Sequence, residues 1–295
     1  MNKIGIYYAY WTHNWDVDFH PFVDKVADLG FDILEVNGGT IAKMTPEERK
    51  SLCDHAAERQ IELTYCIGLP AEYDVASEDP AVRGRGTAFL QQMARSIGQM
   101  GGGKLSGILY GCWPTTLPMN ADKRPYVKRS IASVKEAVKA AEDNNVFFNM
   151  EVVNRFEQFI LNTAEEAVAF VEQVDSPNCK ILLDTFHMNI EEESIYKAIL
   201  TAGKHLGHLH IGENNRTPPG CGRGIIPWDS LAEALRAIDY QESIVMEPFL
   251  MPGGEVGRDI KVFRDMSIGV DMDAEARAAC QFMRKTLEAA ANKAG

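Results

Sequence analysis

The stretch NMEVVNRFE at 149–157 sets the pattern that decides the fold, because an apolar run of strand length closes on a single carboxylate. The same pattern recurs in LLDTFHMN at 182–189, HLHIGENNR at 208–216 and VMEPF at 245–249. The polar residues that close these runs are Glu151, Asp184, His210 and Glu247. Successive members lie about one strand–helix unit apart, which takes roughly 30 residues or more. We therefore expect them at the same end of four successive parallel strands.

Outward from these runs, apolar segments of strand length alternate with helical patterns along the whole chain. The expected strands are 3–10, 31–36, 61–68, 104–111, 146–153, 179–184, 206–212 and 242–249. The expected helices are 18–29, 46–60, 80–99, 124–144, 163–174, 191–203, 229–238 and 273–292. Near-continuous apolar runs are typical of parallel strands that are covered on both faces.

Eight strand–helix units in a chain of 295 residues are the count of a (β/α)8 TIM barrel. The alternative is a doubly wound open sheet, but no GxGxxG follows the first expected strand. Low-complexity tracts and Gly/Ser linkers are absent, so we place no domain boundary and expect one catalytic barrel over residues 1–295. Active sites of such barrels lie at the carboxyl ends of the strands, where all four polar residues fall.

The composition of the chain limits the binding partners and the cellular compartment that we expect for the protein. The formal net charge of −12 makes nucleic acid an unfavourable partner, because an acidic chain repels phosphate backbones. The N-terminus lacks the features of a signal peptide, and no run approaches the ~18 apolar residues of a membrane span. The six cysteines show no CxxC pairing and are interpreted as reduced thiols. We therefore expect a cytoplasmic protein without a membrane partner.

Three carboxylates and one imidazole would form a hard, oxygen-rich site. That donor set favours Mn²⁺, Mg²⁺ or Co²⁺ over structural zinc, which prefers thiolates and imidazoles. Without a cation, clustered carboxylates would repel one another and raise each other's pKa. The alternative is that each acidic residue caps a helix or pairs with a nearby arginine.

Other polar residues follow the same strands and would lie in the loops beyond them. They are Glu157, His187 and Arg216. A polyol substrate needs such donors and acceptors to fix its orientation. The alternative interpretation is that these residues form salt bridges and turn contacts within the loops.

Aromatic residues follow three of the expected strands, namely Trp15, Trp113 and Phe249. They would form the wall of a sugar pocket or simply pack the rim of the barrel. His208 lies two residues before His210 and shares its face of the strand, so both side chains could point inward. Only His210 lies at the mouth, and His208 is interpreted as a supporting or core residue.

Glu151 and Glu247 belong to strands that are not neighbours, so their carboxylates can approach a bound sugar from different sides. A cation that chelates a carbonyl and an adjacent hydroxyl acidifies the carbon between them and stabilises the enediolate. With a base on one face of that carbon and an acid on the other, deprotonation and reprotonation invert it. If one base served one face only, the proton would move between carbons, as in an aldose–ketose isomerase.

Over nearly its whole length the chain resembles the D-psicose (D-allulose)/D-tagatose 3-epimerases within the xylose-isomerase-like barrel group. The matching blocks are GIYYAYW (5–11), GFDILEV (30–36), MEVVNRFE (150–157), LNTAEE (161–166), LLDTFHMNIEEESI (182–195), LGHLHIGENNR (206–216), VMEPF (245–249) and the GG-VG-DIKVFRD pattern (253–265).

The resemblance implies an Mn²⁺ or Co²⁺ site formed by Glu151, Asp184, His210 and Glu247. It implies that Glu151 and Glu247 are the acid/base pair that inverts C3 of a free ketohexose such as D-fructose/D-psicose or D-tagatose/D-sorbose. It implies polar substrate contacts from Glu157, His187 and Arg216, with Glu157 near the O1–O3 end. It implies apolar contacts around the far end of the sugar from Tyr7, Trp15, Cys66, Trp113 and Phe249. Members of the family are homodimers or homotetramers.

The chain departs from the family around that far end. Position 66 is Cys, as in tagatose-type members, where many psicose-type members have Gly. The stretches ILYGCWP (108–114), GCGRGIIPW (220–228) and NGG (37–39) also differ from the common forms. These differences leave the preferred ketose open.

Two further classes of function remain as alternatives. An endonuclease-IV-like repair enzyme uses a related barrel but needs more histidine ligands and a basic face, which the −12 charge and seven histidines disfavour. A sugar-binding barrel without catalysis would bind a ketose but would not exchange its C3 hydrogen with solvent.

Overall fold

The computed structural model describes residues 2–292 and contains a closed barrel of parallel strands in the order β1 to β8. The strands are β1 (Ile4–Tyr7), β2 (Ile33–Asn37), β3 (Glu62–Leu69), β4 (Gly103–Cys112), β5 (Val146–Val152), β6 (Cys179–Asp184), β7 (Leu206–Ile211) and β8 (Ile244–Met246). β1 pairs with both β2 and β8, which closes the barrel. The predicted (β/α)8 fold is confirmed.

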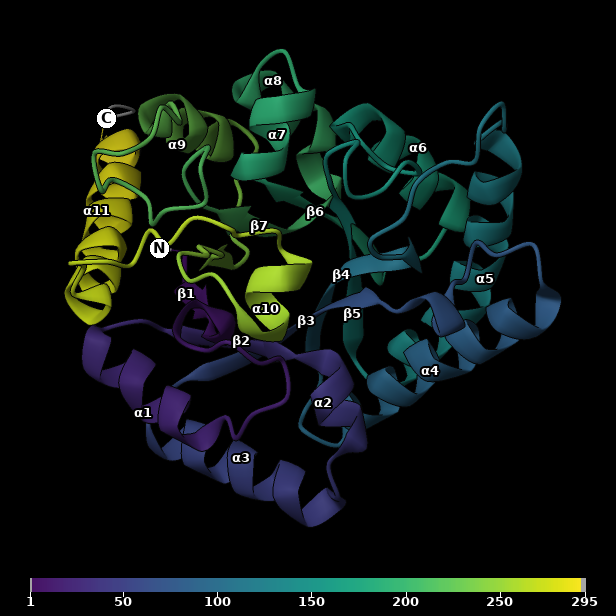
Figure 1. Cartoon of the computed structure of the whole chain (residues 1–295), viewed down its shortest axis with the longest axis horizontal. Helices are drawn as coiled ribbons and strands as arrows, with labels where there is room; N and C mark the ends of the chain where they lie inside the picture. The colour runs from purple at the N-terminus through teal and green to yellow at the C-terminus, as the bar shows by residue number, and fades with distance from the viewer. Residues whose placement is uncertain (1, 293–295) are drawn as a thin grey trace.

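Helices surround the strands, as Figure 1 shows. They are α1 (His20–Leu29), α2 (Gly38–Lys43), α3 (Pro46–Glu58), α4 (Pro80–Gly98), α5 (Arg124–Asp143), α6 (Ala164–Val174), α7 (Thr185–Glu191), α8 (Ile195–Ala202), α9 (Trp228–Ala237), α10 (Gly254–Asp259) and α11 (Met272–Asn292). Short 3-10 helices cover Tyr8–Trp11, Ala71–Tyr73 and Gly203–His205. Within residues 2–292, no helix has the length and apolar character needed to cross a membrane.

Local sequence signals explain where several helices begin and end. The Thr45 hydroxyl accepts from the Glu48 backbone N–H at 3.2 Å, and Glu48 accepts from the Thr45 N–H at 2.7 Å. This reciprocal capping box fixes the start of α3, with Pro46 at its first position. Gly30 ends α1 in the left-handed conformation at φ 88°, which glycine adopts without a steric penalty.

The first strand is shorter than expected, because it ends at Tyr7 and a 3-10 helix replaces the expected continuation to residue 10. The last strand is also shorter and ends at Met246, one residue before Glu247. The backbone N–H of Glu247 still donates to the Ile211 carbonyl at 2.9 Å, so this residue keeps its place at the strand end. Pro248 follows and has no N–H with which to continue the ladder.

Three short helices, α2, α7 and α10, were not expected from the sequence, and the first two follow a strand directly. Asn37 caps α2 by accepting from the Thr40 N–H at 3.0 Å. A Cβ atom at Gly38 would lie 2.8 Å from Leu105, and one at Gly39 would lie 2.9 Å from Ile67. Glycine at both positions therefore lets α2 pack closely over β3 and β4. The second short helix, α7, begins at Thr185, so the expected helix over 191–203 is in fact α7 followed by α8.

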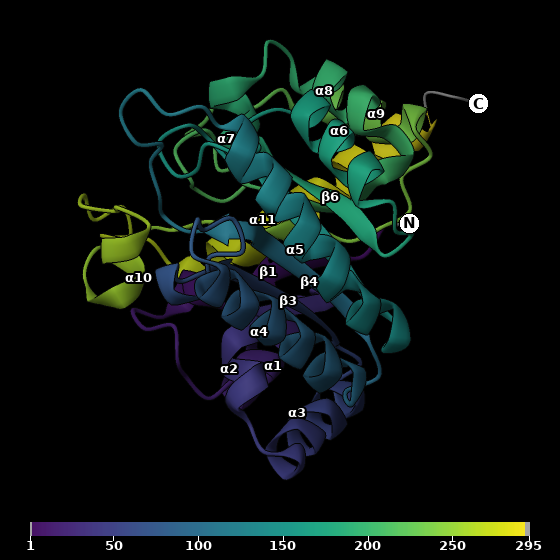
Figure 2. The same cartoon turned by 90° about the vertical axis from the view of Figure 1, so that its right-hand side faces the viewer.

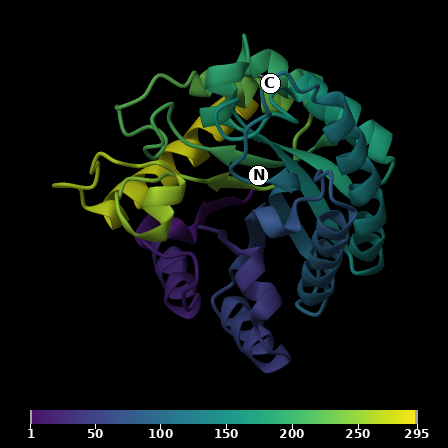
Figure 3. The same cartoon turned by 45° about the vertical axis from the view of Figure 1, so that its right-hand side comes forward.

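The loops that follow the strands gather at one end of the barrel. α10 follows β8 at this end, and Figures 2 and 3 show it standing apart from the ring of longer helices. The Val256 N–H donates to the His13 carbonyl at 3.0 Å, which joins α10 to the loop after β1. The carboxyl end of the barrel is therefore covered by segments from both ends of the chain.

Candidate metal centre and active site

The structure brings the four predicted residues together at the carboxyl end of the barrel. Glu151 lies near the end of β5, Asp184 ends β6, His210 lies near the end of β7 and Glu247 follows β8. One ligand atom from each lies within 4.8 Å of the others, and all four side chains are buried. Parallel strands with matched registers explain this convergence, since Asp184 pairs directly with His210.

His210 presents one ring nitrogen to the carboxylates. Its Nδ1 atom lies 3.6 Å from Oε1 of Glu151 and 3.8 Å from Oε1 of Glu247. Among residues 2–292 this buried nitrogen has no hydrogen-bond partner. An unsatisfied buried nitrogen that faces carboxylate oxygens is the arrangement expected where a cation belongs.

The electrostatics of the cluster also indicate a cation site. Burial raises the pKa of Glu247 to about 8, and the charges of Glu151 and Asp184 add to the rise while His210 and Arg216 oppose it. Such a raised pKa means that three buried carboxylates are not all stably ionised on their own. Three hard oxygen donors and one imidazole fit a divalent cation of the Mn²⁺, Mg²⁺ or Co²⁺ kind.

Arg216 reaches the cluster from the loop after β7. Its Nη2 atom lies 3.3 Å from Oε2 of Glu247 and 3.8 Å from Oδ2 of Asp184. The guanidinium carbon lies 4.4 Å from the ring centre of Phe186 and 5.0 Å from that of Phe249. The arginine is therefore buried in a fixed orientation, with its charge directed at the carboxylates.

His187 lies on α7 and is close to Arg216. Its ring is held by hydrogen bonds from the loop after β5. The Asn154 backbone N–H donates to His187 Nδ1 at 3.1 Å, and the Asn154 amide lies 2.8 Å from the same nitrogen. Because the Asn154 backbone N–H can only donate, Nδ1 accepts, and Nε2 also faces a donor, the guanidinium of Arg216. This Nε2 atom lies 4.0 Å from Oε1 of Glu151 and 3.1 Å from Nη2 of Arg216.

Glu157 is fixed by two donors in the same region. The indole N–H of Trp113 donates to Oε2 at 2.8 Å, and the Asn154 amide donates to Oε1 at 3.1 Å. Burial alone would raise the pKa of Glu157, but His187, Arg216 and these hydrogen bonds bring the pKa below its ordinary value. Glu157 is therefore an ionised acceptor close to the carboxylate cluster.

The predicted apolar residues form a group around Tyr7. Its ring centre lies 6.4 Å from that of Trp15 and 6.3 Å from that of Phe249. The Trp15 indole N–H donates to Asp259 on α10 at 2.9 Å. Cys66 is buried on β3, with its sulfur within 4.8 Å of ligand atoms of Glu35 and His210. Trp113 is joined to Glu157 by its indole N–H and lies on the loop after β4.

The sequence analysis missed three buried polar residues that support the site. Glu35 on β2 is fully buried and contacts His208 and His210. Asn154 links His187 to Glu157, as described above. Glu213 organises the loop after β7 by accepting from the Trp228 indole at 2.9 Å and the Gly220 N–H at 3.1 Å. The signal for Glu35 was present, since it is a charge set between the apolar residues Leu34 and Val36 of an expected buried strand.

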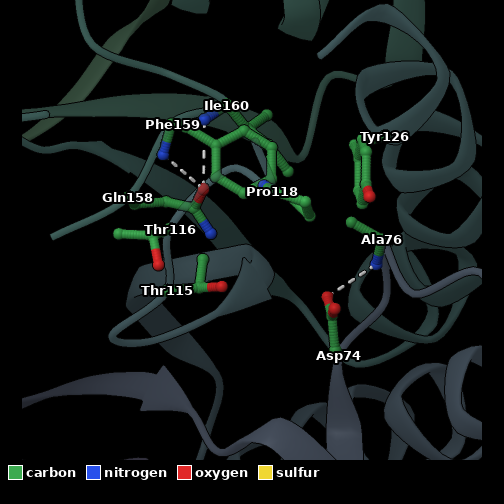
Figure 4. A pocket seen from close by; sticks show the side chains of 9 residues that line it. All are labelled: Asp74, Ala76, Thr115, Thr116, Pro118, Tyr126, Gln158, Phe159 and Ile160. Carbon is green, nitrogen blue, oxygen red and sulfur yellow. Dashed lines mark hydrogen bonds between the residues drawn. The ribbon is translucent and has the colours of Figure 1, made fainter. Parts of the chain in front are cut away.

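A separate cavity of about 100 Å³ lies beside the loops that carry Trp113 and Glu157, and Figure 4 shows it from close by. Its lining consists of Asp74, Ala76, Thr115, Thr116, Pro118, Tyr126, Gln158, Phe159 and Ile160. The Gln158 side-chain oxygen is already bound to the backbone N–H groups of Phe159 and Ile160, at 2.6 and 3.1 Å. None of the four clustered residues lines this cavity, so it is distinct from the candidate metal centre.

Comparison with known proteins identifies the family. The model of the xylose isomerase-like TIM barrel family matches residues 23–286. The chain is 46% identical to the D-psicose 3-epimerase of Ruminiclostridium cellulolyticum, over 97% of this chain and 98% of that protein. It is 43% identical to the D-psicose 3-epimerase of Agrobacterium fabrum, over 97% of this chain and 99% of that protein.

A solved structure gives the same result. The D-psicose 3-epimerase of Clostridium cellulolyticum H10 with D-tagatose superposes with a TM-score of 0.93 at 46% identity, covering 97% of this chain and 99% of that one. Both the fold and the sequence therefore match epimerases along their full lengths. The chain is an isomerase-class enzyme that belongs to the xylose isomerase-like TIM barrel family and, within it, to the D-psicose 3-epimerases.

Proposed function

We propose that the chain is a divalent-cation-dependent ketose 3-epimerase that inverts C3 of free ketohexoses, such as D-fructose/D-psicose and D-tagatose/D-sorbose. The observation that carries the proposal is the meeting of Glu151 and Glu247 at one centre from two strands that are not neighbours. Two carboxylates that reach one carbon from different sides are what inversion by proton transfer requires. The names of the relatives support the same reaction.

Glu151, Asp184, His210 and Glu247 are the residues that would hold the cation, and Mn²⁺ or Co²⁺ are the ions we propose. When bound, the cation supplies Lewis-acid polarisation of the sugar carbonyl and so makes the neighbouring C–H bond more acidic. Two observations support a divalent cation at these four residues. They are the unpartnered Nδ1 atom of His210 and the oxygen-rich donor set.

The two glutamates perform the proton transfers. One carboxylate takes the proton from C3, and the electrons of the C3–H bond form the C2–C3 double bond as charge moves to the carbonyl oxygen. The other glutamate, in its protonated form, returns a proton to the opposite face of C3. Inversion therefore requires one member of the pair to be ionised and the other protonated at the start of the reaction.

Three further side chains would orient the sugar. Glu157 is an anionic acceptor for a hydroxyl, and His187 would contact the sugar from beside Glu151, whose Oε1 atom lies 4.0 Å from its Nε2 atom. Arg216 is already paired with Glu247 and Asp184, so its charge is not available for a phosphate group. An anionic centre whose arginine is engaged in this way suits an uncharged sugar, which supports a free ketose as the substrate.

The far end of the pocket would be formed by Tyr7, Trp15, Cys66, Trp113 and Phe249. Their rings and thiol provide apolar contact rather than directed hydrogen bonds, because the indole N–H groups of Trp15 and Trp113 are bound to Asp259 and Glu157. This end would tolerate different configurations at the distal carbons. A homodimer or homotetramer in the cytoplasm is the proposed working form.

The test is incubation of metal-stripped protein, reloaded with Mn²⁺, with D-fructose in deuterium oxide. We expect a second ketohexose that carries deuterium at C3. A new aldose would instead identify an aldose–ketose isomerase. Sugar binding without any exchange of the C3 hydrogen would identify a binding protein and overturn the proposal.

A further inference from the structure

Glu35 is a carboxylate inside the barrel, below the candidate metal centre. It lies on β2 and is fully buried, whereas His208 and His210 lie on β7. Its Oε1 atom is 2.6 Å from Nε2 of His210, and its Oε2 atom is 2.9 Å from Nε2 of His208. Because β1 and β8 separate β2 from β7 in the closed barrel, these contacts cross the interior.

A third donor completes the surroundings of Glu35. The Thr64 hydroxyl donates to Oε2 at 2.8 Å from the neighbouring position on β3. Both carboxylate oxygens therefore face hydrogen-bond donors from β3 and β7. A carboxylate that is fully buried is costly unless such donors compensate it, so the arrangement calls for a reason beyond packing.

The contact with His210 decides which ring nitrogen faces the candidate metal centre with a lone pair. A carboxylate oxygen accepts, so Nε2 of His210 must be the protonated nitrogen. In the neutral ring the lone pair is then on Nδ1, which is the atom directed at Glu151 and Glu247. Only a nitrogen with a free lone pair can ligate a cation.

We propose that Glu35 is a positioning residue that holds His210 in the tautomer with a proton on Nε2 and a lone pair on Nδ1 for the cation. Its negative charge also makes the imidazole a stronger donor toward the cation. Outer residues of this kind are worth about 10–100-fold in metal affinity. The inference rests on the proposed function only in that the cluster binds a divalent cation.

The neighbours of Glu35 provide a matched control. A purely structural role would depend on the whole set of contacts that tie β2, β3 and β7 together across the interior. Thr64→Val removes one of these contacts but leaves both carboxylate oxygens for the histidines. Glu35→Gln keeps the shape, removes the charge and replaces one acceptor oxygen by an amide that donates.

The first experiment is titration of the metal-stripped wild type and both variants with Mn²⁺ by calorimetry, with the melting temperature of each metal-free protein as the measure of folding. We expect Glu35→Gln to bind Mn²⁺ about 10–100-fold more weakly than the wild type and Thr64→Val to bind like the wild type. Equal affinity in Glu35→Gln and the wild type would overturn the inference while leaving the proposed function intact. A wild type that binds no divalent cation would instead refute the metal centre itself.

The second experiment does not depend on a variant that folds. Wild-type protein with ¹⁵N-labelled histidine is loaded with diamagnetic Mg²⁺, and the protonated nitrogen of His210 is identified by NMR through its directly bonded hydrogen. We expect the proton on Nε2, shifted downfield by the short contact with Glu35, and a bare Nδ1. A proton on Nδ1 would contradict the assignment.

Discussion

The indole N–H of Trp113 donates to Oε2 of Glu157 at 2.8 Å and so joins the loop after β4 to the loop after β5. A second contact, from the Thr115 N–H to the Glu157 carbonyl at 3.0 Å, runs alongside it. Together they place an ionised carboxylate at the mouth of the barrel, with Nδ1 of His187 4.0 Å from its Oε1 atom. The orientation of Glu157 is therefore set by neutral donors, which single substitutions can remove one at a time.

Trp113→Phe keeps an aromatic ring but removes the donor to Glu157. We expect kcat/KM for a ketose to fall by about tenfold, since a hydrogen bond to a charged group contributes roughly 1.5–3 kcal/mol and part of that is recovered by substrate. Steady-state kinetics on the Mn²⁺-loaded enzyme provide the measurement. Unchanged kinetics would show that the indole N–H has no part in orienting Glu157.

Asn154→Ala should affect catalysis without affecting the metal. This change removes the amide contacts to both His187 and Glu157, so we expect kcat/KM to fall by about 10–100-fold. The Mn²⁺ affinity should stay at the wild-type value, because Asn154 contacts none of the four clustered residues in the hydrogen bonds described above. Asn162→Ala is the control, since its amide bonds only to the Val153 and Gln158 carbonyls in the same loop. Equal losses in both variants would indicate a general disturbance of the loop.

The lowered pKa of Glu157 predicts that the free energy of unfolding depends on pH. Its pKa is lower in the folded protein than its ordinary value of 4.5, because His187, Arg216 and two hydrogen bonds outweigh burial. The unfolded chain therefore binds more protons in the range just below pH 4.5, and the stabilisation that Glu157 provides is lost as the pH falls through its folded pKa. We expect metal-free wild type to exceed Glu157→Gln in free energy of unfolding at pH 7 and to lose that advantage progressively as the pH falls below 4.5 and through the folded pKa. Urea unfolding across this pH range is the measurement, and a pH-independent difference would argue against an ionised Glu157.

Glu151→Gln and Glu247→Gln should each slow the inversion of C3 but still allow the C3 hydrogen to exchange with solvent. We expect kcat for epimerisation to fall by about 10²–10⁴-fold in either variant, because one face of C3 loses its acid/base group. The remaining glutamate should still exchange the C3 hydrogen of one epimer with deuterium, and the two variants should prefer opposite epimers. Exchange is read by NMR on D-fructose and on D-psicose at saturating Mn²⁺. Both variants acting on the same epimer would contradict a two-face mechanism.

Metal removal should lower thermal stability, since the cation compensates the repulsion among Glu151, Asp184 and Glu247. A ligand at 100 times its Kd stabilises a folded protein by about 2.7 kcal/mol. For a chain of this size we expect the melting temperature to fall by about 5–10 °C on chelation. Calorimetry with and without chelator tests this, with Glu247→Gln expected to show a smaller shift. An unchanged melting temperature would count against a cation at this position.

The fold and the meeting of the four polar residues at one end of the barrel could be predicted from the sequence because both depend on local patterns. Near-continuous apolar runs mark buried parallel strands, and Glu151, Asp184 and His210 each stand at or near the end of one. Glu35 could not be assigned in this way, since its partners lie on the far side of the barrel and are distant in sequence. Asn154 was missed because its partner His187 lies on α7, after the next strand, and no local pattern in the loop after β5 reveals that contact.

The short helix α2 has a consequence for engineering of substrate preference. Asn37 pairs with Cys66 in the register of β2 and β3, so the glycines that follow Asn37 are next to the wall that carries this thiol. A Cβ atom at Gly38 or Gly39 would meet the terminal Cδ1 atom of Leu105 or of Ile67, so these side chains on β4 and β3 would have to move aside. Libraries aimed at new ketoses should therefore vary Cys66 first and leave both glycines fixed, because enlarging either one would repack side chains on the strands beside this thiol.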